Sequence, residues 1–394
     1  MQPGRREALP EPDAASAAHS ARVLAHVRDR IRAAGGALSF ASYMHEVLYA
    51  PGLGYYAAGA TNFGAAGDFV TAPEISPVFG RIVARQVAAV LGSVDEPAVL
   101  EFGAGSGRLA VDVLGALAEL DALPREYRIL EPAADLKARQ QALIGAAIPD
   151  LAGSVRWLDR LPAGHRGAII ANEVLDALPV ERFRRTADGV SQFFVAEAGA
   201  GLELVERPAG AALDAAVRGI EDALGEPLPD GYVSEVCLAA PAWLADVAQL
   251  LDEGIALLFD YGVSRREYYA PERAGGWLRC HFRHRAHDDP LVLPGIQDIT
   301  AWVDFTAVAD AALDRGLEVA GFVTQAHFLM HGGLAEELAH FADLPTAAQL
   351  ELSAQVKTLT LPGEMGERFR CLGLARGPVA VPPAFTAVDR AVSL

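Results

Sequence analysis

Three glycines at every second position interrupt the segment 98–114, which reads AVLEFGAGSGRLAVDVL. An apolar run precedes them and a helical apolar pattern follows, so we expect a strand, a tight turn and the start of a helix. Gly103, Gly105 and Gly107 permit positive φ angles and a close backbone approach. The free N–H groups at the start of the helix suit an electron-rich ligand group. The spacing therefore predicts a ligand-binding loop.

The residues beside these glycines disfavour the commonest nucleotide sites. A nicotinamide fingerprint GxGxxG that began at Gly103 would need glycine or alanine at position 108, where the chain has Arg108. A P-loop would need Gly-Lys-Ser/Thr after the glycines, and none follows. Glu101 at the strand end would repel a pyrophosphate, but it could hold a positively charged ammonium group, directly or through water. A nicotinamide-dependent oxidoreductase is therefore disfavoured.

Carboxylates also end the next two predicted strands. Glu131 is placed to accept hydrogen bonds from both hydroxyls of a ribose, as an acid does in doubly wound nucleotide sites. Asp159 ends the following strand, within reach of an adenine amino group. Each acid alone could equally cap a helix or sit in a turn. A ligand with an ammonium, a ribose and an adenine but no phosphate is S-adenosylmethionine, and we expect it as the cofactor.

A fourth predicted strand ends in the polar residues of IIANEVLDALPVERF. Asn172, Glu173 and Asp176 stand between apolar runs, so we expect them at the sheet edge, facing the methyl donor. The structural alternative is that Asn172 or Asp176 caps the following helix. The functional hypothesis is that Asn172 contributes to the cofactor site, while Glu173 and Asp176 bind and orient the methyl acceptor.

Strands alternate with helices through most of the chain, which predicts an α/β, doubly wound, mainly parallel sheet with ligands at the carboxyl ends of its strands. We expect a disordered leader over residues 1–18 and an N-terminal helical region, a substrate or lid element, over 19–94. A Rossmann-like domain would span 95–394, with an inserted antiparallel β segment at about 181–250. The strands of the sheet are expected at 98–102, 127–131, 155–159, 168–173 and 255–262.

Charge and hydropathy limit the partners of this chain of 394 residues. The net charge of −18 would repel a nucleic-acid backbone, and the arginine clusters at 182–185 and 279–285 are typical of solvated faces or loops, so we expect no nucleic-acid substrate. An acidic protein would more naturally attract a basic partner, such as an arginine-containing protein segment. No window of 18 or more apolar residues is present, so no membrane insertion is expected.

The first twenty residues carry charges and prolines where a secretory segment would be apolar. Three cysteines, odd in number and far apart, fit a reducing compartment. We therefore expect a cytoplasmic location. His281, His284 and His287 follow Cys280 and could suggest a metal site, but in an arginine-rich loop we expect surface or substrate contact and no metal.

Several motifs together resemble the MidA-like family of S-adenosylmethionine-dependent methyltransferases, from about residue 35 onward and in the same order. The resemblance implies a class I methyltransferase fold, with the glycine loop and Glu131 holding the cofactor and the segment GDFVTAPEIS closing over the site. The chain departs from the family's commoner TSPEISQ form at Ala72 and Pro77. The motifs that carry the resemblance are GDFVTAPEISPVFG, EFGAGSGRLA, NEVLDALPVERF, FDYG, GIQDITAWVDF and PGEMGERFRCL.

This family includes mitochondrial assembly factors that symmetrically dimethylate an arginine of a respiratory complex I subunit. The resemblance therefore implies a protein substrate with an accessible arginine. A guanidinium has a pKa at least five units above neutral pH, so full deprotonation before attack would cost roughly 7 kcal/mol. Paired carboxylates can instead hold the cation and aim one nitrogen at the methyl group. Glu74, Glu173 and Asp176 are the candidates, with Glu173 preferred on its rigid strand end.

The alternative function is an assembly or chaperone-like factor that binds S-adenosylmethionine for stability and turns it over slowly. The abundance of acids around the fourth strand favours the enzyme, because a pure binding protein would not need them.

Overall fold

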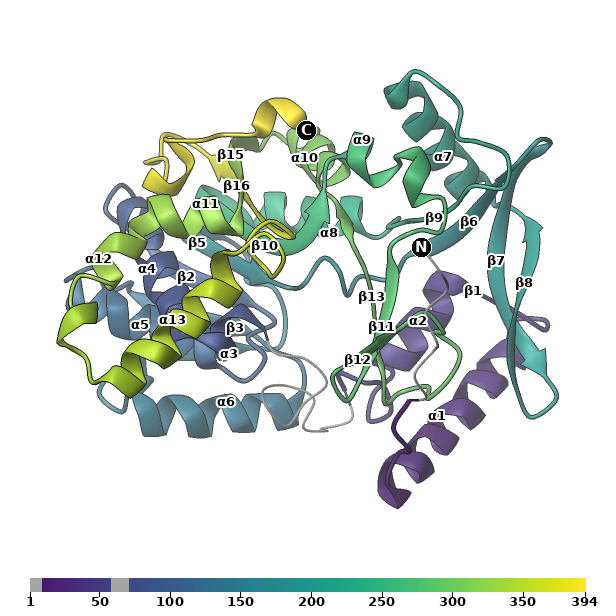
Figure 1. The fold of residues 1–394 in the computed structure, drawn as a ribbon, viewed down its shortest axis with the longest axis horizontal. Helices are drawn as coiled ribbons and strands as arrows, with labels where there is room; N and C mark the ends of the chain where they lie inside the picture. Colours follow the sequence, from purple (N-terminus) through teal and green to yellow (C-terminus); the bar gives the residue numbers. More distant parts are fainter. Residues whose placement is uncertain (1–8, 58–70) are drawn as a thin grey trace. The chain divides into compact units, whose positions relative to one another are not determined.

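The computed structural model describes residues 9–57 and 71–394, and the chain forms two compact units, most of whose helices and strands are labelled in Figure 1. The first unit is formed by Met1–Val70, Leu178–Leu238 and Pro271–Ala301, and the second by Thr71–Ala177, Ala239–Ala270 and Trp302–Leu394. Each unit takes strands and helices from separate stretches of the sequence, so each is described by itself.

The second unit contains an eight-stranded sheet with the order β15-β16-β10-β5-β2-β3-β4, and β14 adds to β10. Strands β4, β3, β2, β5 and β10 run parallel, whereas β16 is antiparallel to both β10 and β15. This is a doubly wound α/β sheet of the class I methyltransferase type, which confirms the predicted fold. The strands are β2 (Ala98–Phe102), β3 (Glu126–Leu130), β4 (Val155–Leu158), β5 (His165–Asn172), β10 (Leu251–Val263), β14 (Val303–Asp304), β15 (Glu318–Thr324) and β16 (Phe369–Arg376).

Helices cover this sheet because its central strands are apolar on both faces, as parallel strands require. One face packs against α4 and α5 in a core that includes Val99, Ile170 and Leu257. Helices α8 and α10 contact each other and also pack on β10. The helices of the unit are α3 (Ala72–Ile75), α4 (Pro77–Leu91), α5 (Arg108–Glu119), α6 (Ala134–Ala147), α8 (Ala240–Leu250), α9 (Arg265–Tyr268), α10 (Phe305–Leu313), α11 (Gln325–Leu329), α12 (Ala335–Glu337) and α13 (Thr346–Thr360).

The first unit has its own core around α1 and α2. Its five-stranded sheet has the order β1-β7-β6-β9 with β8 on β7, and a three-stranded sheet has the order β12-β11-β13. The elements are α1 (Ala14–Ala33), β1 (Leu38–Ser39), α2 (Phe40–Tyr49), β6 (Glu181–Thr186), β7 (Gly189–Ala198), β8 (Gly201–Pro208), α7 (Ala211–Leu224), β9 (Val233–Val236), β11 (Leu278–Phe282), β12 (Arg285–His287) and β13 (Asp298–Ala301).

The expected domain boundaries need correction. Helix α1 begins at Ala14, inside the expected leader 1–18, because the Asp13 carboxylate caps it by accepting a hydrogen bond from the Ser16 N–H at 2.9 Å. The region 19–94 is divided, since α1 and α2 belong to the first unit and α3 and α4 to the second. The expected insertion 181–250 contains the antiparallel strands β6 to β9, whereas its last helix α8 belongs to the second unit and packs on β10.

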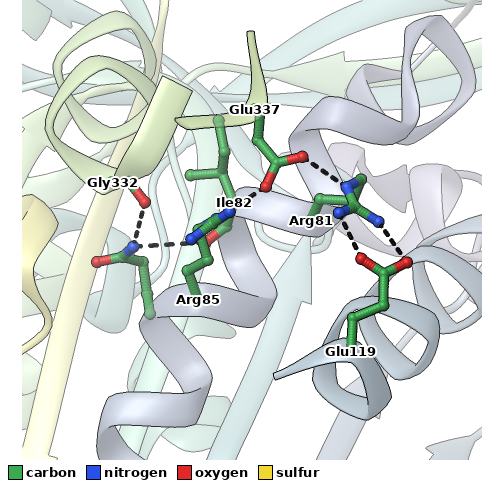
Figure 2. Close-up of polar contacts among 7 residues, drawn as sticks. Arg81, Ile82, Arg85, Glu119, Gly332 and Glu337 are labelled. Carbon is green, nitrogen blue, oxygen red and sulfur yellow. Dashed lines mark hydrogen bonds and ion pairs between the residues drawn. The ribbon is translucent and has the colours of Figure 1, made fainter. Parts of the chain in front are cut away.

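A long connection between β15 and β16 is fastened to α4 by charged side chains (Figure 2). Glu337, with 6% of its side chain exposed, accepts hydrogen bonds from Arg81 Nε at 2.5 Å and from Arg85 Nε at 2.8 Å. Arg81 also donates to Glu119 of α5 at 2.7 Å. One carboxylate with little access to water thus holds two arginines of one helix.

Replacing Glu337 with alanine should lower the free energy of unfolding by about 1–3 kcal/mol, because two charge-assisted hydrogen bonds are lost and two arginines lose a partner. Glu336→Ala is the matched control, since Glu336 is exposed on the same short helix. Urea denaturation measures both. Equal stability of the two variants would contradict a structural role for the Glu337 contacts.

Candidate active site

The glycine loop adopts the predicted conformation. Gly103, Gly105 and Gly107 have φ angles of 63°, 52° and 90°, in the left-handed region that favours glycine. Helix α5 begins at Arg108 directly after this loop. A Cβ atom on Gly107 would approach the Gln140 side chain to 3.3 Å, so a second element confines the loop. The loop stands at the carboxyl end of β2, beside the place where the strand order reverses toward β5.

Gln140 of α6 joins the loop to two other strand ends. Its Nε2 donates to the Gly105 carbonyl at 3.0 Å and to the Glu131 carboxylate at 3.1 Å, and its Oε1 accepts from Trp157 Nε1 at 2.9 Å. The residue is fully buried. Gln140 was not predicted from the sequence. Leu136, Gln140 and Ile144 are four residues apart and share the buried face of α6, so this spacing could have identified Gln140 as a buried polar residue.

Glu131 lies one residue beyond β3 and is buried. It also accepts a hydrogen bond from the Ala133 N–H at 2.9 Å, and burial raises its pKa. Because a carboxylate has about four acceptor positions, these two bonds leave capacity for ribose hydroxyls. Glu131 is thus held in place for the predicted role, which stays a prediction.

Glu101 is buried at the end of β2 and accepts a hydrogen bond from the Tyr127 hydroxyl at 2.7 Å. Burial raises the pKa of Glu101 to about 7. Asp159, by contrast, follows β4 with 79% of its side chain exposed and forms an ion pair with Lys137 at 3.5 Å. The proposed contacts of Glu101 with an ammonium group and of Asp159 with an adenine stay predictions.

The polar residues after β5 lie beside the glycine loop. A Cβ atom on Gly103 would lie 3.4 Å from Cγ2 of Val174, which places the turn 172–176 against the loop. Asn172 ends β5, and its Nδ2 donates to Glu173 at 3.2 Å. Asp176 is buried and accepts a hydrogen bond from the Tyr261 hydroxyl. The structure therefore brings Asn172, Glu173 and Asp176 together.

Glu74 reaches the same loop from a different element. It lies in α3, and its carboxylate accepts a hydrogen bond from the Ser106 hydroxyl. Residues 58–70, which include the start of the segment GDFVTAPEIS, lie outside the described residues. The contact ties α3 to the glycine loop, while a catalytic role for Glu74 stays a prediction.

The cysteine and histidines at 280–287 form a strand hairpin in the first unit. Cys280 and His281 belong to β11, His287 ends β12, and His284 is in the turn between them. Across residues 9–57 and 71–394, no three His, Cys, Asp or Glu side chains gather as metal ligands would. No helix in the same ranges is long and apolar enough to span a membrane.

Comparison with known proteins decides the family. A family model described as "Putative S-adenosyl-L-methionine-dependent methyltransferase" matches residues 82–323. The chain belongs to this family. A solved structure of a protein from Burkholderia thailandensis bound to S-adenosyl-homocysteine is 40% identical, covers 98% of this chain and 100% of that chain, and has a TM-score of 0.92. The chain is a methyltransferase, and its cofactor is S-adenosylmethionine.

Two curated relatives extend the comparison. The Drosophila melanogaster "Protein arginine methyltransferase NDUFAF7 homolog, mitochondrial" is 30% identical over 94% of this chain and 89% of the relative. The mouse "Protein arginine methyltransferase NDUFAF7, mitochondrial" is 29% identical over 89% of this chain and 84% of the relative. Because these relatives are named as mitochondrial, the comparison contradicts our expectation of a cytoplasmic location, which was wrong.

The arrangement fits the cofactor. Left-handed glycines expose backbone at a helix start, and the buried acceptor Glu131 lies beside them, as a ligand with ribose hydroxyls requires.

Gly107→Ala should weaken S-adenosyl-homocysteine binding at least tenfold, because the added methyl group meets Gln140 and the φ angle is unfavourable for alanine. Gly115→Ala is the control, since its Cβ meets nothing within 4 Å. Calorimetric titration measures both, and equal affinities would contradict the loop's role.

Proposed function

We propose that this methyltransferase modifies an arginine of a protein substrate. The observation that supports this most directly is the group of carboxylates, Glu173 and Asp176, on the turn beside the glycine loop. A guanidinium presents five N–H donors in a plane, and paired carboxylates match that geometry. The names of the curated relatives, which are protein arginine methyltransferases, support the same acceptor. The family resemblance suggests a subunit of respiratory complex I as the substrate.

The proposed residues divide into two groups. The cofactor supplies a methyl group bonded to a sulfonium, which is electrophilic without any metal. Glu101, Glu131, Asp159, Asn172 and the three loop glycines are proposed to hold it. Glu173 and Asp176 would hold the guanidinium as a cation, orient one nitrogen and accept the proton that it loses. Glu74 is proposed as a third acid at the acceptor site.

Glu173→Gln should lower arginine methylation by about 10²-fold, because one charge-assisted bond to the guanidinium is lost. Its affinity for S-adenosyl-homocysteine should stay within threefold of the wild type. Asp150→Asn removes an exposed acid elsewhere in the second unit and serves as the control. The measurement is transfer of a labelled methyl group to proteins of a strain that lacks this gene, followed by mass spectrometry of the modified residues.

Labelled arginine with the wild type and its loss with Glu173→Gln support the proposal. Wild-type protein that binds S-adenosyl-homocysteine but labels no arginine would contradict it and would favour the assembly or chaperone-like alternative. Wild-type activity in Glu173→Gln would contradict the role of this residue alone.

A further inference from the structure

Asp260, near the end of β10, contacts the turn 172–176, which carries the proposed acceptor residues. It is buried, and its Oδ2 accepts hydrogen bonds from the N–H groups of Leu175 at 2.9 Å and Asp176 at 3.2 Å. Its Oδ1 accepts from the Tyr261 N–H at 2.9 Å. These three backbone donors offset only part of the effect of burial and of repulsion from Asp176 and Glu173, which raise the pKa of Asp260 well above its ordinary value. Asp260 therefore fastens the turn after β5 to the neighbouring strand β10.

The same turn contains an unusual backbone conformation. Glu173 has a φ of 53°, a left-handed conformation that non-glycine residues seldom adopt. Its N–H donates to the Phe259 carbonyl at 2.8 Å, so β10 holds both sides of the turn. Such a conformation persists only where the surroundings impose it, and it is concentrated at functional sites. The hydrogen bonds to Phe259 and Asp260 provide that constraint.

The two carboxylate oxygens of Asp176 differ in their hydrogen bonds. Tyr261 donates its hydroxyl proton to Oδ2, whereas Oδ1 is buried and has no hydrogen-bond partner among the residues that the structure describes. The Oδ1 atom of Asn172 is likewise buried without a hydrogen-bond partner among the described residues. Buried acceptors without donors are costly, so two of them on one turn indicate a ligand that supplies N–H groups.

The charged surroundings of Asp176 favour proton uptake. The titratable groups around it are Asp260, Glu173 and Tyr261. Burial raises the pKa of Asp176 to about 6, against the opposing effects of the Tyr261 hydroxyl and of the backbone N–H groups of Ala177 and Asp176. Burial raises the pKa of both acids, and repulsion from Asp176 and Glu173 adds to the rise at Asp260, so the two acids titrate as a pair. Asp176 keeps one oxygen without a donor, so it is the acid of the pair with a position open for an N–H proton.

We propose that Asp260 and Tyr261 are positioning residues that make Asp176 the proton acceptor of methyl transfer and leave Glu173 to hold the guanidinium. This inference rests on the proposed arginine acceptor. A guanidinium nitrogen forms the bond to the methyl carbon, the C–S bond breaks with its electron pair passing to sulfur, and the N–H proton passes to Oδ1 of Asp176. Solvent then takes the proton, which restores the carboxylate.

Tyr261→Phe tests the assignment with a minimal change. Loss of the hydroxyl removes a donor that favours the ionised carboxylate, so the pKa of Asp176 should rise. Activity is lost as pH falls through that pKa, and the acidic limb of the kcat profile should therefore move to higher pH by at least half a unit. We expect kcat at neutral pH to fall about tenfold, because Asp176 also loses the hydroxyl that positions its carboxylate, with unchanged affinity for S-adenosyl-homocysteine.

Asp260→Asn should move the same limb in the opposite direction. It removes a negative charge beside Asp176, which lowers the pKa of that acid, and it also replaces one acceptor oxygen of the turn with an amide NH₂. We expect kcat to fall at least tenfold, while S-adenosyl-homocysteine affinity stays within threefold. Tyr269→Phe, at a buried tyrosine of the same unit, is the control and should keep the wild-type profile.

Opposite shifts of the acidic limb in the two variants support the assignment, because a general loss of structure would not give opposite signs. An unchanged profile for Tyr261→Phe on a wild type that methylates arginine would overturn this inference alone. A wild type that binds S-adenosyl-homocysteine but methylates no arginine would overturn the proposed function and this inference with it.

Discussion

The side chain of Gln140 makes the interaction on which the proposed cofactor site depends. One amide joins the carbonyl of the glycine loop, the carboxylate after β3 and the indole of Trp157. These groups come from three separate strand ends, and the buried amide of Gln140 satisfies its own hydrogen bonds by joining them. The glycine conformations and the position of Glu131 are therefore maintained together rather than independently.

The proposed acceptor site, the turn 172–176, is subject to a different constraint, which is the burial of two acids near each other. Asp176 and Asp260 repel each other when both are ionised, and the pKa of Asp260 is raised by burial and by this repulsion. Backbone N–H groups and the Tyr261 hydroxyl offset that cost. Two buried acids close together lower the free energy of unfolding, and such arrangements are concentrated at functional sites.

The sequence predicted the sheet well because parallel strands leave strong local signals. The five predicted parallel strands are present, with ends shifted by a few residues. Contacts between distant segments could not be predicted. Gln140 contacts residues that are far away in the chain. The acids of the turn 172–176 depend on Asp260, which reaches its position only when β10 pairs with β5.

The most direct test of the account is calorimetric titration of S-adenosyl-homocysteine into the wild type and Glu131→Gln. Glu126→Gln, an acid at the start of the same strand, is the control. We expect binding to the wild type and the control, and at least tenfold weaker binding to Glu131→Gln, because an amide replaces one acceptor oxygen. Equal affinity of all three proteins, or no binding to the wild type, would contradict the placement of the cofactor at the carboxyl ends of β2 and β3.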